Sequence, residues 1–335
     1  MFGGKLADYL KSRSHDPSVR VNRHPFPDGE ASGHITLSSE PTTVKGEPVE
    51  RDRVEGISVG QSSESRFTDF LDGIERTSVP YFESMLPVVY GYTSAVIRRR
   101  DAGRSMGTWS ITPTHDREHL FVPFSLVEPS SIREAQLPVI DSEQHSKVTA
   151  VHPMAVQEKG YQAVEKLRGR LEAQLAREWI RDHKPSDDRW LVIDGSLTEY
   201  VDNDGDLNAI GIVKSHRTQY FPFEEQKKVL ALAEGERSPV FRTPGRLGAY
   251  SWYLRLRPNT GRDIYFGLVR IEAPPVPRTL EMADEISRWL MAERSPISLP
   301  DSRWDRLIYP IRDCEQYLRS LAPSRIMIEA AFSGI

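Results

Sequence analysis

The sequence predicts an α/β protein in which a mixed β-sheet is flanked by helices and preceded by an N-terminal extension. Short apolar, strand-like runs fill residues 67–126, whereas residues 152–182 show helical spacing and residues 190–194 form another strand-like run. A change from strand-like runs to helical spacing and back to a buried strand is typical of α/β proteins. We expect the earlier strands to form an antiparallel meander.

The composition is that of an ordinary globular protein of a reducing compartment. The chain has 335 residues, a formal net charge of -4 and one cysteine, Cys314. A single cysteine excludes an intrachain disulfide framework and a cysteine-rich zinc site. The acidic balance counts against a stand-alone nucleic-acid-binding protein. No apolar run reaches the length of a membrane span, no signal-peptide core follows Met1, and no Walker-type glycine loop occurs. We therefore expect a cytoplasmic protein, with no membrane segment, that does not itself hydrolyse ATP.

Residues 1–65 differ in amino-acid composition from the rest of the chain. They are rich in Ser, Pro, Gly and charged residues, and only Leu6 to Leu10 suggests a short helix. Such segments bury too little apolar surface to fold alone. Two interpretations remain open, a flexible tail and an N-terminal arm that docks a partner. We expect residues 66–335 to form the folded domain.

The strands and helices that we expect after residue 66 follow from the position and spacing of apolar residues. One long helix begins near His152, because Val164, Leu171 and Leu175 recur at helical steps and face one side. The expected strands are 67–73, 87–97, 105–112, 120–126, 190–194, 207–213, 250–256 and 263–272, and the other expected helices are 227–233, 280–292 and 311–321.

Two Asp-Gly pairs frame the long helix. Asp72-Gly73 ends the first expected strand, Asp194-Gly195 ends the strand after the helix, and Glu172 lies on the helix between them. This is the order in which an RNase H-like core assembles its metal site. Phosphodiester hydrolysis with two Mn²⁺ or Mg²⁺ ions needs carboxylates that converge from different elements. The sequence therefore predicts Asp72, Glu172 and Asp194 as catalytic metal ligands.

Each acid also has a simpler interpretation. A strand-end aspartate can cap a turn, and a helical glutamate usually faces solvent. Helical geometry does not separate Glu172 from Glu165, which lies on the same edge of the helix. Scattered histidines argue against a zinc hydrolase, and the Asp-Gly-Ser sequence at Ser196 is not a nucleophile elbow.

Lys214 ends the strand that follows Asp194. A cation at this position can orient a scissile phosphate and neutralise developing charge, so we predict a catalytic role. The simpler interpretation is a lysine whose aliphatic stem packs at a strand end. Ile212 stands where restriction-type nucleases need an acid, which excludes that architecture.

With these residues in place, the chain resembles the NurA nuclease family from about Phe67 to Arg325. The Leu-Glu motif of the family's helix matches Glu172 rather than Glu165 and is the reason to prefer it. We therefore expect residues 66–335 to form a NurA-like nuclease domain with an RNase H-like fold. The matching motifs are Leu71-Asp72-Gly73-Ile74, Arg168-Gly169-Arg170-Leu171-Glu172, Leu191-Val192-Ile193-Asp194-Gly195-Ser196-Leu197, Gly211-Ile212-Val213-Lys214 and Tyr309-Pro310.

The resemblance implies a Mn²⁺- or Mg²⁺-dependent DNA nuclease that forms a homodimer. It also implies docking on a HerA-type hexameric ATPase that translocates DNA, in DNA repair by end resection or in anti-phage defence. Such a partner accounts for the acidic net charge, because the ring would hold the DNA and the nuclease needs only a local basic channel. The candidate channel residues are Arg98, Arg99, Arg100, Arg255 and Arg257.

The chain departs from the family at two places. Ile74 replaces the serine of the opening motif, and no histidine follows Tyr309. Asp305, Asp313 or Glu315 could supply a late acid as fourth metal ligand instead. These departures favour an alternative, a catalytically impaired RNase H-like scaffold or regulatory subunit. Candidate dimerisation segments are residues 280–292 and 326–332, the latter being equally interpretable as a last core strand.

Overall fold

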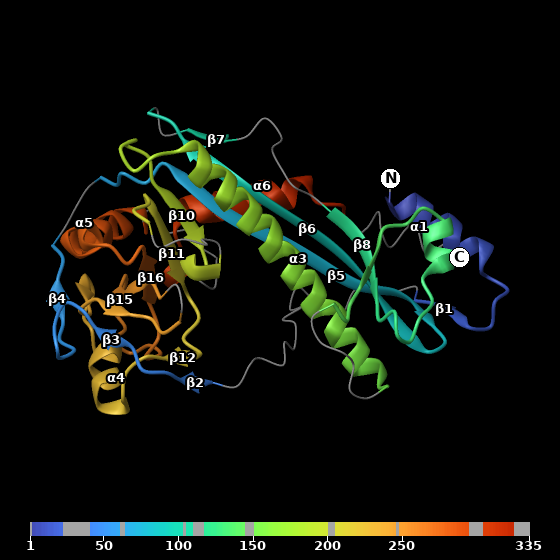
Figure 1. The fold of residues 1–335 in the computed structure, drawn as a ribbon, viewed down its shortest axis with the longest axis horizontal. Coiled ribbons are helices and arrows are strands. Elements are labelled where there is room, and N and C mark those ends of the chain that lie inside the picture. The colour runs from blue at the N-terminus through green and yellow to red at the C-terminus, as the bar shows by residue number, and fades with distance from the viewer. Residues whose placement is uncertain are drawn as a thin grey trace.

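The computed structural model describes residues 2–22, 41–60, 64–102, 105–109, 117–144, 151–199, 205–245, 248–294 and 304–324. It confirms a mixed α/β architecture, in which one large sheet is flanked by helices (Figure 1). Along the main path the strands lie in the order β3 (Glu47–Pro48), β14 (Phe241–Arg242), β15 (Tyr250–Arg255), β16 (Leu268–Ala273), β11 (Ala209–Val213), β10 (Leu191–Asp194), β5 (Asp69–Glu83), β6 (Leu86–Arg100), β8 (Arg117–Val122) and β9 (Val139–Asp141).

The short strand β10 lies at the centre of the sheet. It pairs in parallel with β5 on one side and with β11 on the other. A parallel partner needs a crossover connection, and helix α3 (Pro153–Asp182) directly precedes β10 in the chain. Next to this parallel centre, β5, β6 and β8 form the antiparallel meander that the sequence predicts.

Strands β5 and β6 form a hairpin much longer than the sequence suggests. The expected strand 67–73 continues to Glu83, and the ladder with β6 contains one irregularity between Ser78 and Tyr81. At the far end of this hairpin lie α1 (Phe2–Ser12), β1 (Val19–Val21) and α2 (Ser130–Glu134) (Figure 1). The hairpin thus extends well beyond the parallel centre of the sheet.

Helices cover the two faces of the central strands. On one face Leu71 and Ile193 pack with Leu171 of α3. On the other face Phe70 packs in a cluster with Cys314 of α6 (Tyr309–Leu321) and with residues of α5 (Pro277–Glu293). Successive side chains of a strand point to opposite faces of the sheet. The face of each polar residue in these strands therefore follows from the face of its apolar neighbours.

The described parts of residues 1–65 pack against the folded domain. Leu6 and Leu10 of α1 are buried, in agreement with the expected short helix, and β1 pairs with β5. Further along, β2 (Thr42–Thr43) pairs with β12 (Thr218–Gln219), β3 with β14, and β4 (Ile57–Ser58) with β13 (Glu236–Arg237). Docking of a partner by this segment stays a prediction.

Other boundaries differ from expectation for local reasons. β8 ends before Pro123, which cannot donate to a sheet ladder, and β16 starts only at Leu268 because residues 263–266 form a turn. β7 (Met106–Thr108) is the described part of the expected strand 105–112. The helix expected at 227–233 is α4 (Phe223–Leu230), and residues 326–332 lie outside the described residues. Short 3₁₀ turns occur at η1 (Leu197–Glu199) and η2 (Trp304–Arg306).

Within the described ranges, no helix combines the length and the apolar character that crossing a membrane requires.

Helix α1 should contribute measurably to the stability of the whole domain. Leu10 is fully buried in the main core, so Leu10→Ala is expected to lower the free energy of unfolding by about 2–5 kcal/mol. Lys5→Ala, an exposed position on the same helix, is the matched control and should change it little. Urea denaturation measures both, and an unchanged midpoint for Leu10→Ala would show that α1 is a detachable arm.

Candidate functional site

The sheet divides where β10 ends. The pairing of β10 with β5 stops at Ile193 and Leu71, and Asp194 ends the strand, whereas β5 continues to Glu83. Among the described residues, no strand pairs with Gly73 to Ser78 on the side that β10 has left. We call this place, at Asp72 and Asp194, the fork. It brings one aspartate from each of the two strands to the same open edge.

The two aspartates belong to the same face of the sheet. Asp72 shares its side with Phe70, and Asp194 with Val192, so both belong to the face that α6 covers. Lys214 follows β11 on this face, and its Nζ lies 2.8 Å from Asp194 Oδ1. The fork therefore holds two acids and one base from three adjacent strands.

Asp72 lies in an environment that disfavours its charge. Its side chain is nearly buried, at 9 % exposure, and its Oδ1 accepts a hydrogen bond from the backbone N–H of Gly73 at 2.8 Å. Burial raises the pKa of Asp72 well above its usual value, the charges of Asp194 and Glu172 raise it further, and Lys214 opposes the shift. The ionised form would therefore be stabilised by added positive charge.

Glu172 reaches the fork from α3, across the position of Gly73. It is 1 % exposed, and its Oε1 accepts a hydrogen bond from Arg168 Nη1 at 2.8 Å. A Cβ atom on Gly73 would overlap this carboxylate oxygen, so only glycine leaves the space that Glu172 occupies. Glu165, seven residues earlier, is exposed. The structure thus separates two glutamates that helical spacing alone did not.

Gly211 allows the turn after Asp194 to lie directly on β11. A Cβ atom on Gly211 would come within 2.5 Å of Leu197 N and 2.6 Å of Gly195 O. Gly195 itself has a φ of 138°, a conformation that glycine adopts far more readily than other residues. Two glycines therefore set the path of the chain as it leaves Asp194.

The structure brings the four predicted site residues to the fork, whereas the three candidates for a fourth acid are each paired with another group. Asp313 forms an ion pair with Arg98 at 2.7 Å, and Glu315 forms one with Arg319 at 2.6 Å. Asp305 is buried and accepts a hydrogen bond from Gly267 N at 2.8 Å. Within the described part of the chain, no three His, Cys, Asp or Glu side chains have the arrangement of a metal-binding group.

Two of the arginines proposed for a DNA channel cannot line one. Arg255 is fully buried and donates hydrogen bonds to backbone carbonyls that include Leu230 O and Phe266 O. Arg257 is also buried and donates to Arg294 O at 2.7 Å. The prediction for both residues was wrong, because the Arg255 guanidinium binds carbonyls at the end of α4 and in the turn before β16, and that of Arg257 binds a carbonyl at the end of α5.

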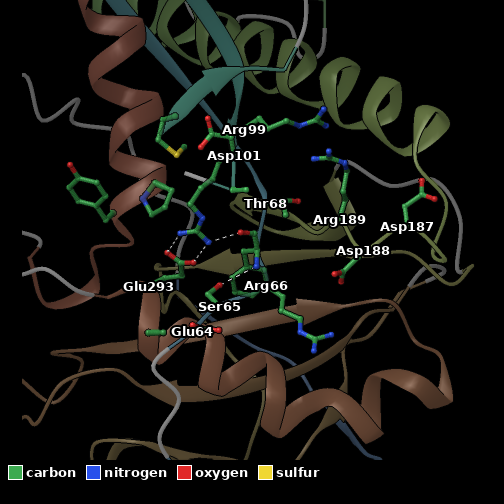
Figure 2. A pocket seen from close by; sticks show the side chains of 17 residues that line it. Glu64, Ser65, Arg66, Thr68, Arg99, Asp101, Asp187, Asp188, Arg189 and Glu293 are labelled. Carbon is green, nitrogen blue, oxygen red and sulfur yellow. Dashed lines mark hydrogen bonds and ion pairs between the residues drawn. The ribbon is translucent and has the colours of Figure 1, made fainter. Parts of the chain in front are cut away.

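The three successive arginines at the end of β6 are half-buried and paired with acids. Arg98 pairs with Asp313, Arg99 with Asp69, and Arg100 with Glu293. Arg99 and Arg100 line a cavity of about 980 Å³ (Figure 2). Its lining residues lie at the start of β5 and β10, and therefore at the opposite end of these strands from Asp194. This cavity is separate from the fork.

Arg168 is a site residue that the sequence analysis did not single out. Besides its bond to Glu172, its Nε lies 3.3 Å from Glu75 Oε2. The signal was present in the sequence, since Arg168 precedes Glu172 by four residues, the spacing at which helical side chains meet.

Comparison with known proteins gives no assignment. No protein-family model matches the chain. No curated protein matches it either. The resemblance to the NurA family therefore stays a prediction from the motifs.

The close approach at Gly211 predicts opposite effects of the same substitution at two glycines. Gly211→Ala should lower the free energy of unfolding by about 1–3 kcal/mol, because backbone atoms of the turn must move. Gly169→Ala on α3, where a Cβ meets no atom, should raise it by up to about 1 kcal/mol. Urea denaturation compares the two, and equal effects would argue against a tightly packed turn.

The raised pKa of Asp72 predicts that its charge destabilises the fold. Asp72→Asn should therefore raise the free energy of unfolding at pH 8 in EDTA, by about 1–3 kcal/mol as for an uncompensated buried polar group. Because the folded-state pKa lies above the unfolded-state value, the penalty is absent below the unfolded-state pKa, grows as the pH rises above it, and is complete above the folded-state pKa. Urea denaturation of both proteins across this range measures the difference. A difference that does not grow with pH contradicts the assignment.

Proposed function

We propose that this protein is a metal-dependent DNA nuclease that hydrolyses phosphodiester bonds at the fork. One observation carries the proposal. Asp72 and Asp194 lie on adjacent parallel strands, on one face, at the point where the sheet opens, and Glu172 and Lys214 approach the same point. Carboxylates that converge from different elements are what two-metal hydrolysis requires.

The order of the elements supports an RNase H-like core. The first acid is on β5, the antiparallel strands β6 and β8 follow, α3 carries the second acid, and β10 ends in the third. β10 returns beside β5, so the first and third acids become neighbours although they are far apart in the sequence. This is the chain order in which such cores assemble a metal site.

The chemical type of the donor atoms at the fork suits Mn²⁺ or Mg²⁺. The donors are carboxylate oxygens, which these hard ions prefer. The charges of Asp194 and Glu172 raise the pKa of buried Asp72, so a divalent cation would relieve repulsion that the fold otherwise sustains. Asp72, Glu172 and Asp194 would hold the ions, which supply stabilisation of the attacking and leaving oxygens.

Basic side chains at the fork would act on the acids and on the substrate. Lys214 holds the carboxylate of Asp194 and, being partly exposed, can also contact a phosphate oxygen of DNA. Arg168 holds the carboxylate of Glu172. Each base thereby fixes the direction of one acid before substrate binds.

The resemblance to the NurA family extends the proposal to partners. We propose that the protein acts in the cytoplasm as a homodimer with a HerA-type hexameric ATPase, in DNA end processing or in anti-phage defence. The net charge of -4 supports a division of labour in which the ATPase ring, rather than this chain, holds most of the DNA backbone.

One observation favours the alternative of a catalytically impaired scaffold. Asp194 and Glu172 already have basic partners, Lys214 and Arg168, so metal ions would compete with two ion pairs. In the scaffold alternative these pairs are permanent and hold the fork together.

Cleavage of end-labelled linear DNA in Mn²⁺, Mg²⁺ or EDTA tests the proposal, with and without a HerA-type ATPase. Wild type should degrade the DNA with either metal and not in EDTA. Asp72→Asn and Asp194→Asn should each reduce the rate by at least about 100-fold, because ligand loss removes several kcal/mol of transition-state stabilisation. Both variants should remain folded.

Glu165→Gln is the matched control, because it changes an exposed glutamate one heptad before Glu172 on the same helix. It should cleave like wild type. If folded wild-type protein cleaves no DNA under any of these conditions, the nuclease proposal is wrong and the scaffold alternative replaces it.

A further inference from the structure

A buried ion pair lies close to the turn that follows Asp194. Arg270 and Glu272 are both on β16, and Glu272 is only 2 % exposed. Removing two charges from water costs several kcal/mol per ion unless further hydrogen bonds satisfy them. Replacing the pair by apolar residues would often be as stable, so its presence calls for a reason beyond stability.

Glu272 uses its second carboxylate oxygen to bind the turn. Its Oε1 takes the ion pair with Arg270, and its Oε2 accepts a hydrogen bond from Ser196 Oγ at 2.6 Å. In the sheet, Glu272 stands opposite Gly211. Because Gly211 has no side chain, the turn can lie over β11 and bring Ser196 within reach of the neighbouring strand.

Arg270 in turn keeps Glu272 in place. Its Nη1 donates a second hydrogen bond, to Ser251 Oγ at 3.1 Å, and its guanidinium carbon lies 4.7 Å from the centre of the Tyr220 ring. With the arginine held on two sides, the Glu272 carboxylate has a fixed direction. The hydrogen bond to Ser196 is therefore strongly directional.

We infer that Glu272 is a positioning residue for the proposed metal site and acts through Ser196 on Asp194. Ser196 lies two residues after Asp194, so fixing its hydroxyl fixes the backbone on which the Asp194 carboxylate stands. The Glu272 carboxylate contacts Ser196 and Arg270, so we assign it a positioning role rather than a ligand role. This inference rests on the proposed function, because it assigns a role at that same site.

Mn²⁺ affinity of the purified protein tests the inference directly. Free Mn²⁺ is measured by its electron paramagnetic resonance signal during titration, without DNA. Ser196→Ala and Glu272→Gln should each weaken Mn²⁺ binding by about tenfold, the usual range for partners that orient a metal ligand. Ser196→Thr keeps the hydroxyl and should retain wild-type affinity. The Ser196→Ala/Glu272→Gln double variant should bind no more weakly than Glu272→Gln alone, because both changes break one chain of contacts.

Ser287→Ala is the matched control, because it removes a buried hydroxyl whose hydrogen bonds go to Trp252 Nε1 and Ala283 O, away from Arg270, Glu272 and the turn. Its Mn²⁺ affinity should stay unchanged even if its thermal unfolding midpoint falls. If Glu272→Gln does not fold, Ser196→Ala, which removes one partly exposed hydroxyl, carries the test.

Two failures are distinguishable. Wild type that binds Mn²⁺ and cleaves DNA, together with Ser196→Ala of equal affinity, overturns the positioning role and leaves the proposed function intact. An equal loss of affinity in Ser287→Ala also overturns it, because the effect is then structural. Wild type that binds no Mn²⁺ overturns the proposed function, and the positioning role with it.

Discussion

The candidate site depends on the difference in length between two parallel neighbours. β10 ends at Asp194, whereas β5 runs on to Glu83, and among the described strands β6 alone pairs with it over most of that length. A central strand that stops early leaves backbone and side chains of its neighbour without the usual cover. At this place the sheet gathers acids from several elements beside an edge that no strand of the described ranges closes.

The carboxylates at the fork repel one another, and the folded state tolerates this cost in free energy. Burial and two neighbouring carboxylates disfavour the charge of Asp72, and Lys214 offsets only part of that cost. The rest is offset elsewhere, by the large apolar clusters that α3 and α6 form on the two faces of the same strands. Glycine contributes in two different ways. Gly73 leaves space for the side chain of Glu172, whereas Gly211 leaves space for the backbone of the turn after Asp194.

Much of this arrangement could be predicted from the sequence, and the limits have physical causes. The spacing of apolar residues and the order of the runs predicted α3, β10 and the two Asp-Gly pairs. Such spacing is visible in the sequence because helices and strands turn their apolar residues toward a core. The preference for Glu172 required a family motif, since equal helical phase makes Glu165 and Glu172 indistinguishable until packing is known. The Glu272–Ser196 contact could not be predicted, because it depends on the register between β11 and β16. Arg255 was misassigned because a sequence does not distinguish a buried arginine that satisfies carbonyls from an exposed one.

The long hairpin of β5 and β6 has a consequence for how the two ends of the molecule communicate. From Asp72 to Glu83 the strand spans roughly 35 Å, at about 3.3 Å per residue. This is several times the screening length of about 8 Å at physiological ionic strength. The electrostatic interaction between charges near α1 and β1 and the acids at the fork is therefore almost fully screened. Any influence between these ends must pass mechanically, through the hydrogen-bonded ladder of the two strands.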